Sequence, residues 1–592
     1  MCGIVGRVNK VRPVDEKLLL EMRDTLTHRG PDGKGIYISH DKLVGLGHRR
    51  LSLMDLSDKG AQPMTNENKT IWATVNGEIY NYPELKKELQ AKGHHFASKS
   101  DSEVVVHAYE EWGEDLASHL NGMFAFGIWD DNKKMLMLVR DRFGIKPLYY
   151  FQDSSTFIFA SEIKAIIEDP QVPRNLDHKS ICDYLTYRYI PCPGTIWKDV
   201  KKVQPGHYLL IDEQGNIQIK KYWSLEYGDN DGDPNELISD IDELLLASVS
   251  SHTMSDVSIG SFLSGGYDSS ALVSYLNKIN HPIQSFSIGF ENWSNSEHKF
   301  AEIVANKFEA EHESIILNRS GLDLVEKLAF YYDEPIADIS IVPTYEVSCL
   351  ASKSVKAVLS GEGADEIFGG YTWYKSMAET SSDAGFFSKL SRILPGANKA
   401  FTLEHYASAM EMGGYDRREL TDILNGDLHS FIPEDPQWFY NSQFSGGLSP
   451  VKSLQALDIK CFMSELVLTK IDRASMANSL EVRVPFLDHR LVQYMFNLKE
   501  SAYYKPNVKK YLLYENIKND LPDSILSREK QGFVGPDHYY QDYNWYKEVL
   551  LDGKLIADRI IRRETTEKWL EQKDHWRLWK LAILEFWYTR WN

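Results

Sequence analysis

Hydrophobic and polar positions follow two different patterns along the chain. In the first third, short apolar runs end at Gly, Asn or Asp, which predicts β-strands separated by turns. A helix is predicted over residues 102–112, where apolar side chains recur every three or four positions. The polar, breaker-rich stretch 228–234 predicts a linker. Strands are expected in this first part at residues 71–75, 135–139, 208–211 and 216–220.

After the linker, the pattern changes to an alternation of helices and strands. Such an alternation predicts a parallel α/β sheet. From about residue 372 to the end of the chain, helical patterns dominate. Helices are expected at residues 236–251, 269–279 and 300–311, and strands at 257–263, 283–290 and 355–359.

Length and composition narrow the class of protein. The chain has 592 residues, 43% hydrophobic and 26% charged, which is typical of a soluble protein with two or more domains. No apolar run reaches about 18 residues, so no membrane span is expected. The net charge of −19 argues against a general nucleic-acid binder. We expect a cytoplasmic protein, because no secretory signal opens the chain and the cysteines are few and scattered: Cys2, Cys182, Cys192, Cys349 and Cys461.

Cys2 is the first candidate for chemistry. If Met1 is removed, Cys2 carries a free α-amine with a pKa of about 7.7–8.0, which can act as the base for its own thiol. A cysteine at position 2 is often accidental when it stands alone. Here four signatures follow it in order: HRGPD at 28–32, HRRLS at 48–52, NGEIYN at 76–81 and SDSE at 100–103.

These segments together resemble the class II, N-terminal-nucleophile glutamine amidotransferase domain. The resemblance implies that Cys2 attacks the glutamine side-chain amide to form a thioester. It also implies that Asn76 and Gly77 donate to the oxyanion. Glutamine would be bound by Arg50, Asn76, Gly77, Glu78 and Asp101. His28 and Arg29 are expected to have a structural role, bracing the turn at residues 30–32.

A second constellation lies after the linker. The sequence SGGYDSS at 264–270 falls between a predicted strand and a predicted helix, where small residues and a helix N-terminus suit phosphate binding. It lacks the lysine of a Walker loop and resembles the loop of N-type ATP pyrophosphatases. SGEGADE at 360–366, KIDR at 470–473, EVRVPFLD at 481–488 and REKQGF at 528–533 extend the resemblance to glutamine-dependent asparagine synthetases.

That resemblance implies a role for each matching residue. Asp268 and Asp365 would hold Mg²⁺, Lys530 would neutralise the leaving pyrophosphate, and Glu362 would act as a general base. For Asp472, Arg473, Glu481 and Arg483 we favour a buried ion-pair network. The residues expected to bind ATP are Phe262, Ser264, Gly265, Gly266, Asp268, Ser269, Ser270, Ile288, Ser360 and Gly361.

The resemblance also implies the fold and the reaction. We expect a mixed α/β and α+β protein: an Ntn-hydrolase layered β-sandwich flanked by helices, then a parallel-sheet α/β ATP pyrophosphatase domain with a helical extension. The expected divisions are 1–210 for the glutaminase domain, 211–235 for closing strands and linker, and 236–592 for the synthetase domain. The implied reaction uses glutamine, ATP and Mg²⁺ to amidate aspartate through an acyl-adenylate. Ammonia is expected to pass between the two sites through a shielded internal channel. A homodimer is expected from the family.

The acceptor carboxylate is the least defined part of this prediction. Well-studied members of the family often carry a TTIRAS-like stretch, whereas this chain has DEPIADISIVP at 333–343. Aspartate is the preferred acceptor, and a carboxylate of a surface polymer or of a secondary metabolite remains an alternative acceptor. A β-lactam synthetase is disfavoured because Cys2 is intact. A non-catalytic regulator would normally lack a nucleophile, a loop Asp or a Lys, and Cys2, Asp268, Asp365 and Lys530 are all present.

The end of the chain is rich in tryptophan. Trp576, Trp579, Ile583 and Trp587 recur at helical spacing. We expect this stripe to pack against its own domain, with no partner or cofactor involved.

Overall fold

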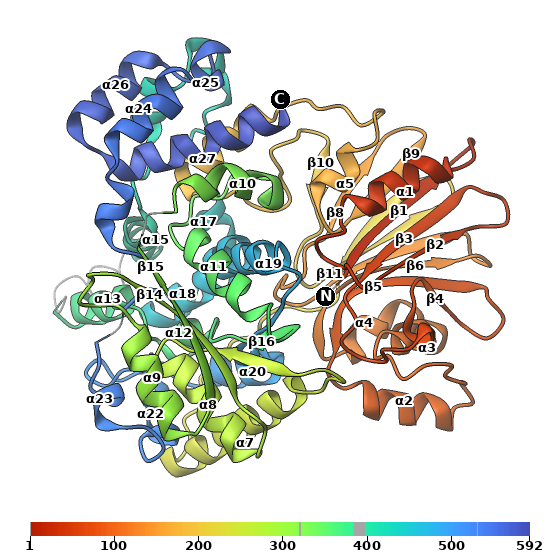
Figure 1. The fold of residues 1–592 in the computed structure, drawn as a ribbon, viewed down its shortest axis with the longest axis horizontal. Coiled ribbons are helices and arrows are strands. Elements are labelled where there is room, and N and C mark those ends of the chain that lie inside the picture. The colour runs from red at the N-terminus through yellow and green to blue at the C-terminus, as the bar shows by residue number, and fades with distance from the viewer. Residues whose placement is uncertain (1, 319–320, 384–396, 530) are drawn as a thin grey trace.

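A computed structural model describes residues 2–318, 321–383, 397–529 and 531–592. The N-terminal part folds as two antiparallel sheets that face one another, and the C-terminal part surrounds one parallel sheet with helices (Figure 1). The fold is therefore mixed α/β, with a layered β-sandwich followed by a parallel-sheet domain, as the sequence predicts.

The two N-terminal sheets each contain six strands among the described residues. The first has the order β10-β8-β9-β1-β3-β2 and the second β12-β11-β7-β6-β5-β4. The strands of the first are β1 (Gly3–Asn9), β2 (Gly33–Ile38), β3 (Val44–Arg50), β8 (Tyr149–Gln152), β9 (Thr156–Ala160) and β10 (Val200–Lys202). Those of the second are β4 (Met64–Thr65), β5 (Ile71–Ile79), β6 (Gly122–Asp130), β7 (Met135–Arg140), β11 (His207–Asp212) and β12 (Ile217–Lys221). The predicted strands at 71–75, 135–139, 208–211 and 216–220 are confirmed.

Three apolar layers hold the sandwich together. Between the sheets, Leu46 and Phe159 of the first pack with Trp129 and Leu138 of the second. Alternate side chains on the outer face of the second sheet pack against α3 (Glu103–Trp112), so the predicted helix over 102–112 is also confirmed. The outer face of the first sheet packs against α1 (Glu16–Asp24), α5 (Ile163–Ile167) and α6 (His178–Tyr187).

The C-terminal sheet is parallel throughout, with the order β15-β14-β13-β16-β17. Its strands are β13 (Ile259–Phe262), β14 (Gln284–Phe290), β15 (Glu311–Leu317), β16 (Ala357–Leu359) and β17 (Glu481–Arg483). The helices between them include α7 (Pro234–His252), α8 (Tyr267–Lys278), α9 (His298–Lys307), α10 (Asp323–Tyr332) and α11 (Ile341–Ala351). The predicted alternation is confirmed, with one difference: the helix expected over 300–311 ends at Lys307, because Glu311 already begins the edge strand β15.

Three consecutive helical segments lie between the parallel sheet and the sandwich. They are α18 (Pro450–Leu457), a π-helical segment Asp458–Val467 and α19 (Leu468–Met476). Figure 1 shows α19 next to the beginning of the chain, where Cys2 precedes β1. Long π-helical segments are rare and are often found at functional sites.

The tryptophan-rich tail packs against its own chain, as expected. Trp579 and Trp587 of α27 (His575–Trp591) are buried. The Trp587 indole N–H donates to the carbonyl of Asp333 at 2.9 Å, and its ring lies 5.4 Å from that of Trp197 in the N-terminal part. The tail therefore joins the two halves. No helix among the described residues is both long and apolar enough to span a membrane.

Candidate active sites

Cys2 lies at the edge of the sandwich core, immediately before β1. Its backbone N–H donates to the Asn76 side-chain oxygen Oδ1 at 3.0 Å, and the residue is 8% exposed. Burial raises the pKa of the Cys2 thiol, so a nearby base is needed to form the thiolate. The predicted loss of Met1 concerns a residue outside the described ones.

Asn76 and Gly77 follow one another on β5, beside Cys2. The Asn76 amide Nδ2 is buried and has no hydrogen-bond partner among the described residues, so a donor is available there. Gly77 has a φ of +141°, and an added Cβ would lie 2.0 Å from the carbonyl oxygen of Met123. Only glycine fits this backbone. The pair therefore has the chemistry of an oxyanion hole.

The three charged residues expected to bind glutamine differ in their surroundings. The Arg50 guanidinium donates to the carbonyls of Met54, Asp55 and Ser57, so it holds the loop after β3. Asp101 is buried and accepts from the Ile79 N–H at 2.8 Å. Burial raises the pKa of the Asp101 carboxyl.

Glu78 contacts the other half of the molecule. Its Oε2 lies 3.0 Å from Arg483 Nη2 of β17, and Arg483 also pairs with Glu481 at 2.7 Å. Burial and the nearby Glu481 raise the pKa of the Glu78 carboxyl. The expected glutamine site therefore adjoins the interface between the two halves.

The second site is a cavity of about 390 Å³ at the carboxyl ends of β13, β14 and β16. Ligands of parallel α/β sheets bind at such ends. Gly265 lies in the turn before α8 and Ser270 lies in the first turns of α8, and neither is part of the lining. Lys530 lies outside the described residues. The predicted residues that line the cavity are Phe262, Ser264, Gly266, Asp268, Ser269, Ile288, Ser360, Gly361, Glu362 and Asp365.

The loop at 264–270 has the geometry of a phosphate cradle. Gly265 has a φ of +70°, and an added Cβ would lie 2.5 Å from the backbone of Phe300. The Ser264 N–H donates to the Ser269 hydroxyl at 3.1 Å, which closes the turn before α8. The N-terminal N–H groups of α8 thus lie at the cavity, where an anion is favoured.

Lys510 is a functional candidate that the sequence analysis missed. Its ammonium contacts both Asp268 and Asp365, the latter at 2.7 Å. The two carboxylates expected to hold Mg²⁺ therefore converge on one cation, and hard oxygen donors of this kind fit Mg²⁺. No local motif marks Lys510, because Asp268 lies 242 positions away along the chain.

Glu362 lines the cavity beside the loop at 264–270. Its Oε2 atom is buried and has no hydrogen-bond partner among the described residues. A carboxylate oxygen in this state is available to accept a proton from a group bound in the cavity.

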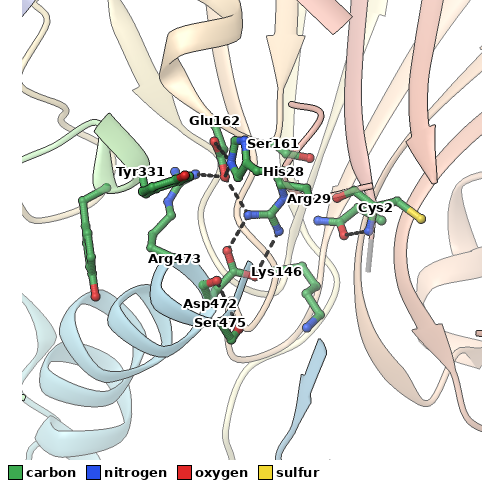
Figure 2. A network of polar contacts seen from close by, with 12 residues as sticks. Cys2, His28, Arg29, Lys146, Ser161, Glu162, Tyr331, Asp472, Arg473 and Ser475 are labelled. Carbon is green, nitrogen blue, oxygen red and sulfur yellow. Dashed lines mark hydrogen bonds and ion pairs between the residues drawn. The ribbon is translucent and has the colours of Figure 1, made fainter. Parts of the chain in front are cut away.

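A buried ion network joins the two sites. Arg29 donates to Glu162 at 2.8 Å and to Asp472 at 2.8 and 3.0 Å, and its Nε donates to the carbonyl of Cys2 at 3.1 Å (Figure 2). Arg473 pairs with Glu162 at 2.7 Å. The predicted network at Asp472 and Arg473 is confirmed. Arg29 extends it across the interface, where we expected it to brace the turn at 30–32.

The neighbouring cations keep the Glu162 carboxylate of this network ionised. Although burial alone would raise it, Lys164 and His28 hold the pKa of the Glu162 carboxyl well below its usual range. Figure 2 shows Arg29 lying between Glu162 and Asp472, with Cys2 beside it. Asp472 is on α19, and Lys470 of the same helix lines the cavity. The network therefore connects the surroundings of Cys2 with a wall of the second site.

Comparison with known proteins gives relatives over the whole chain. Residues 1–223 match the family described as a glutamine amidotransferase domain, and residues 240–589 match the family described as asparagine synthase. The chain is 34% identical to asparagine synthetase (glutamine-hydrolyzing) 1 of Bacillus subtilis (strain 168), covering 100% of this chain and 96% of that protein. It is 32% identical to asparagine synthetase (glutamine-hydrolyzing) 3 of the same organism, covering 96% and 93%. It is also 29% identical to amidase chry2 of Gibberella zeae, covering 97% and 94%.

Proposed function

We propose a function from the premise that this chain belongs to the asparagine synthase family and carries a glutamine amidotransferase domain, which makes it a ligase that uses glutamine and ATP. The proposed reaction amidates the side-chain carboxylate of aspartate with ammonia released from glutamine. Its products are asparagine, glutamate, AMP and pyrophosphate.

The proposed first half-reaction takes place at Cys2. With Met1 removed, the α-amine of Cys2 takes the thiol proton and the thiolate attacks the amide carbon of glutamine, while Asn76 Nδ2 and the Gly77 N–H stabilise the oxyanion. The resulting α-ammonium returns the proton to the amide nitrogen, and the C–N bond breaks to release ammonia and leave a thioester. Water then hydrolyses the thioester to glutamate. The Asn76 Nδ2 donor, which has no hydrogen-bond partner among the described residues, supports this assignment. Arg50, Glu78 and Asp101 are proposed to bind the α-carboxylate and α-ammonium groups of glutamine.

The proposed second half-reaction takes place in the cavity. The loop at 264–270 binds the phosphates of ATP, and the strand-end residues Phe262 and Ile288 contact adenine. An aspartate carboxylate oxygen attacks the α-phosphorus, and pyrophosphate leaves. Asp268 and Asp365 are proposed to hold Mg²⁺, which would neutralise phosphate charge, with Lys530 and Lys510 adding positive charge.

Ammonia is proposed to complete the reaction by attacking the acyl carbon of the adenylate. AMP leaves with the electron pair of the broken C–O bond, and Glu362 accepts a proton from the incoming nitrogen. The path between the sites is proposed to be internal. In support, Arg29 and Lys146 between the sites are 0% and 1% exposed.

We infer the following organisation for the enzyme. Residues 1–210 form the glutaminase domain, 211–235 the closing strands and linker, and 236–592 the synthetase domain. We propose that it acts in the cytoplasm and as a homodimer.

A second acceptor is kept as an alternative. The segment 333–343 differs from the TTIRAS-like stretch of well-studied members, and one relative of similar length is named an amidase. A carboxylate of a surface polymer or secondary metabolite would then replace aspartate in the same chemistry. A non-catalytic regulator is disfavoured, because Cys2, Asp268, Asp365 and Lys530 are all present.

One observation carries the proposal: ten of the residues predicted for adenylation and amide formation line a single cavity. The test is pyrophosphate release from MgATP and glutamine, with and without aspartate, together with analysis of the products for asparagine. Aspartate-dependent pyrophosphate with an equal amount of asparagine is expected. Glutamine hydrolysis with no response to aspartate would contradict the choice of acceptor.

A further inference from the structure

Three charged side chains line a part of the cavity to which no group of ATP is assigned. They are Arg188, Asp338 and Lys470, with the hydroxyl of Ser340 between them. Arg188 belongs to the N-terminal half, where it follows α6. Its backbone carbonyl accepts a hydrogen bond from the N–H of Ala337 at 2.9 Å, so the two halves meet at this wall.

The guanidinium of Arg188 has few hydrogen-bond partners among the described residues. In the part of the chain that the structure describes, its Nη1 has one hydrogen-bond partner, the sulfur of Met412 at 3.7 Å, a weak acceptor, and the group lies 5.7 Å from the Phe462 ring centroid. Its Nε is buried and has no hydrogen-bond partner among the described residues. A buried donor of a charged group is costly to leave unpaired, so this fork suits an anion that enters the cavity.

Asp338 supplies the opposite charge. It accepts from the Ser340 N–H at 2.7 Å and from the Ser340 hydroxyl, and Lys470 donates to that hydroxyl at 2.9 Å. Although burial alone would raise it, Lys470 and Arg188 hold the pKa of Asp338 below its usual value, so the carboxylate is ionised at neutral pH.

The backbone of this wall is fixed in place. Tyr540 donates from its hydroxyl to the carbonyl of Ile339 at 2.6 Å, and Tyr332 donates to the carbonyl of Lys470 at 3.2 Å. A preorganised positive and a preorganised negative group on the same wall match the two charges of an α-amino acid. A plain dicarboxylate would satisfy only the positive group.

We propose that Arg188 binds the α-carboxylate of the acceptor amino acid and Asp338 its α-ammonium, with Lys470 positioning Asp338 through Ser340. This inference rests on the proposed function and adds that the N-terminal half completes the synthetase site. The side-chain carboxylate of the acceptor is then left free for adenylation.

The test compares Arg188→Met with the wild type, because methionine keeps the apolar contacts to Met412 and Phe462 and removes the fork. The KM for aspartate should rise about 10- to 100-fold, the range for a lost charge-assisted hydrogen bond. The KM values for ATP and glutamine should stay within about twofold. Arg174→Met, at an exposed arginine of the same half, is the matched control and should leave all three unchanged.

A second readout uses the α-amide of aspartic acid, which lacks the α-carboxylate. The wild type should prefer aspartate to this analogue, and Arg188→Met should lose most of that preference. Asp338→Asn should likewise lose most of the preference for aspartate over succinate, which lacks the α-ammonium. If Arg188→Met does not fold, Arg188→Lys replaces it, with an intermediate rise in KM expected because the charge stays and the fork is lost.

The outcomes separate the inference from the function it rests on. If the wild type makes asparagine while the Arg188 variants keep both the aspartate KM and the preference over the α-amide, the inference is wrong and the proposed function stands. If the wild type makes no asparagine from aspartate, the proposed function fails, and the inference fails with it.

Discussion

Arg29 and Asp472 form a bidentate ion pair across the interface between the two halves, with N–O distances of 2.8 and 3.0 Å. Both side chains are buried, at 0% and 3% exposure. Arg29 also donates to the carbonyl of Cys2. One guanidinium therefore ties Cys2, the proposed nucleophile, to the helix α19, which carries a wall of the second site.

Removing one partner of this pair should destabilise the protein strongly. Arg29→Ala leaves Asp472 and Glu162 buried without their common cation, and an uncompensated buried charge costs about 3–5 kcal/mol. The midpoint of thermal unfolding, followed by calorimetry, measures the effect. Arg563→Ala is the matched control, because its ion pair with Glu567 is exposed and is worth at most about 1 kcal/mol. Equal melting temperatures for the two variants would contradict this account of the interface.

Replacing the nucleophile should separate the two half-reactions. Cys2→Ala should lower glutamine-dependent synthesis by at least about 1,000-fold, because the thioester cannot form. Synthesis from added ammonium salts should persist, since the cavity is unchanged. Parallel assays with the two nitrogen sources measure this, and Cys349→Ala should behave as the wild type. Loss of both activities in a folded Cys2→Ala protein would argue against separate sites.

Gly265→Ala should impair ATP use selectively. The residue has a φ of +70°, and its added Cβ would lie 2.5 Å from the Phe300 backbone, so the phosphate loop must move. We expect kcat/KM for ATP to fall at least about 10-fold while glutaminase activity is kept. Gly446→Ala is the control, because an added Cβ there meets nothing within 4 Å. A Gly265→Ala enzyme with normal ATP kinetics would remove the loop from the mechanism.

Lys510→Gln tests the cation between the two aspartates. Without its charge, Asp268 and Asp365 repel one another, and the triphosphate loses a nearby positive group. The rate of pyrophosphate release at saturating Mg²⁺ should fall at least about 10-fold. Lys505→Gln, which changes an exposed lysine nearby, should have no effect. An unchanged or faster rate in Lys510→Gln would show that Lys510 only occupies the site when substrates are absent.

Asp458 should make stability depend on pH. This aspartate in the π-helical segment is fully buried, and burial raises its pKa to about 7. The pKa of this carboxyl is about 4 in the unfolded chain and about 7 in the folded protein. Between pH 4 and pH 7, the folded state therefore binds more protons than the unfolded state. The free energy of unfolding therefore falls as pH rises through this window, by up to about 1.4 kcal/mol per pH unit.

Asp458→Asn removes that titration. The difference in melting temperature, variant minus wild type, should grow from pH 4 to pH 7 and stay constant above it. Calorimetry across this range measures the difference, and the exposed Asp552→Asn serves as control. A difference that does not change with pH would mean that Asp458 is ionised throughout.

The elements that the sequence predicts well are those whose burial follows a simple period. β13, β14 and β16 are buried apolar runs between helices, and they lie within one or two residues of their expected ends. The strand Glu311–Leu317 was missed because most of its residues are polar and partly exposed, as suits the edge of a sheet. The order of polar and apolar residues in this segment fits a continuation of the preceding helix α9 as well as it fits a strand.

The site residues also fall into two groups, those that a local motif predicts and those that it does not. Motif residues such as Asp268 and Glu362 lie in the cavity because short segments at strand ends carry them there. No local sequence motif marks Lys510 or Arg188, and none predicts the role of Arg29 at the interface. Their partners lie far away in sequence, with 443 positions between Arg29 and Asp472, and only the packing of the two halves brings them together.

The most direct test of the central claim is a double-label turnover. The enzyme is given glutamine labelled with ¹⁵N in the amide, aspartate labelled with ¹⁸O in the side-chain carboxylate, MgATP and an excess of unlabelled ammonium. Mass spectrometry of the products should find ¹⁵N in asparagine and one ¹⁸O in AMP, because the carboxylate oxygen leaves with the adenylate and ammonia stays inside. Label-free AMP, or ¹⁸O in inorganic phosphate with ADP as the nucleotide product, would contradict the acyl-adenylate. Asparagine made mainly with unlabelled nitrogen would contradict the internal transfer of ammonia.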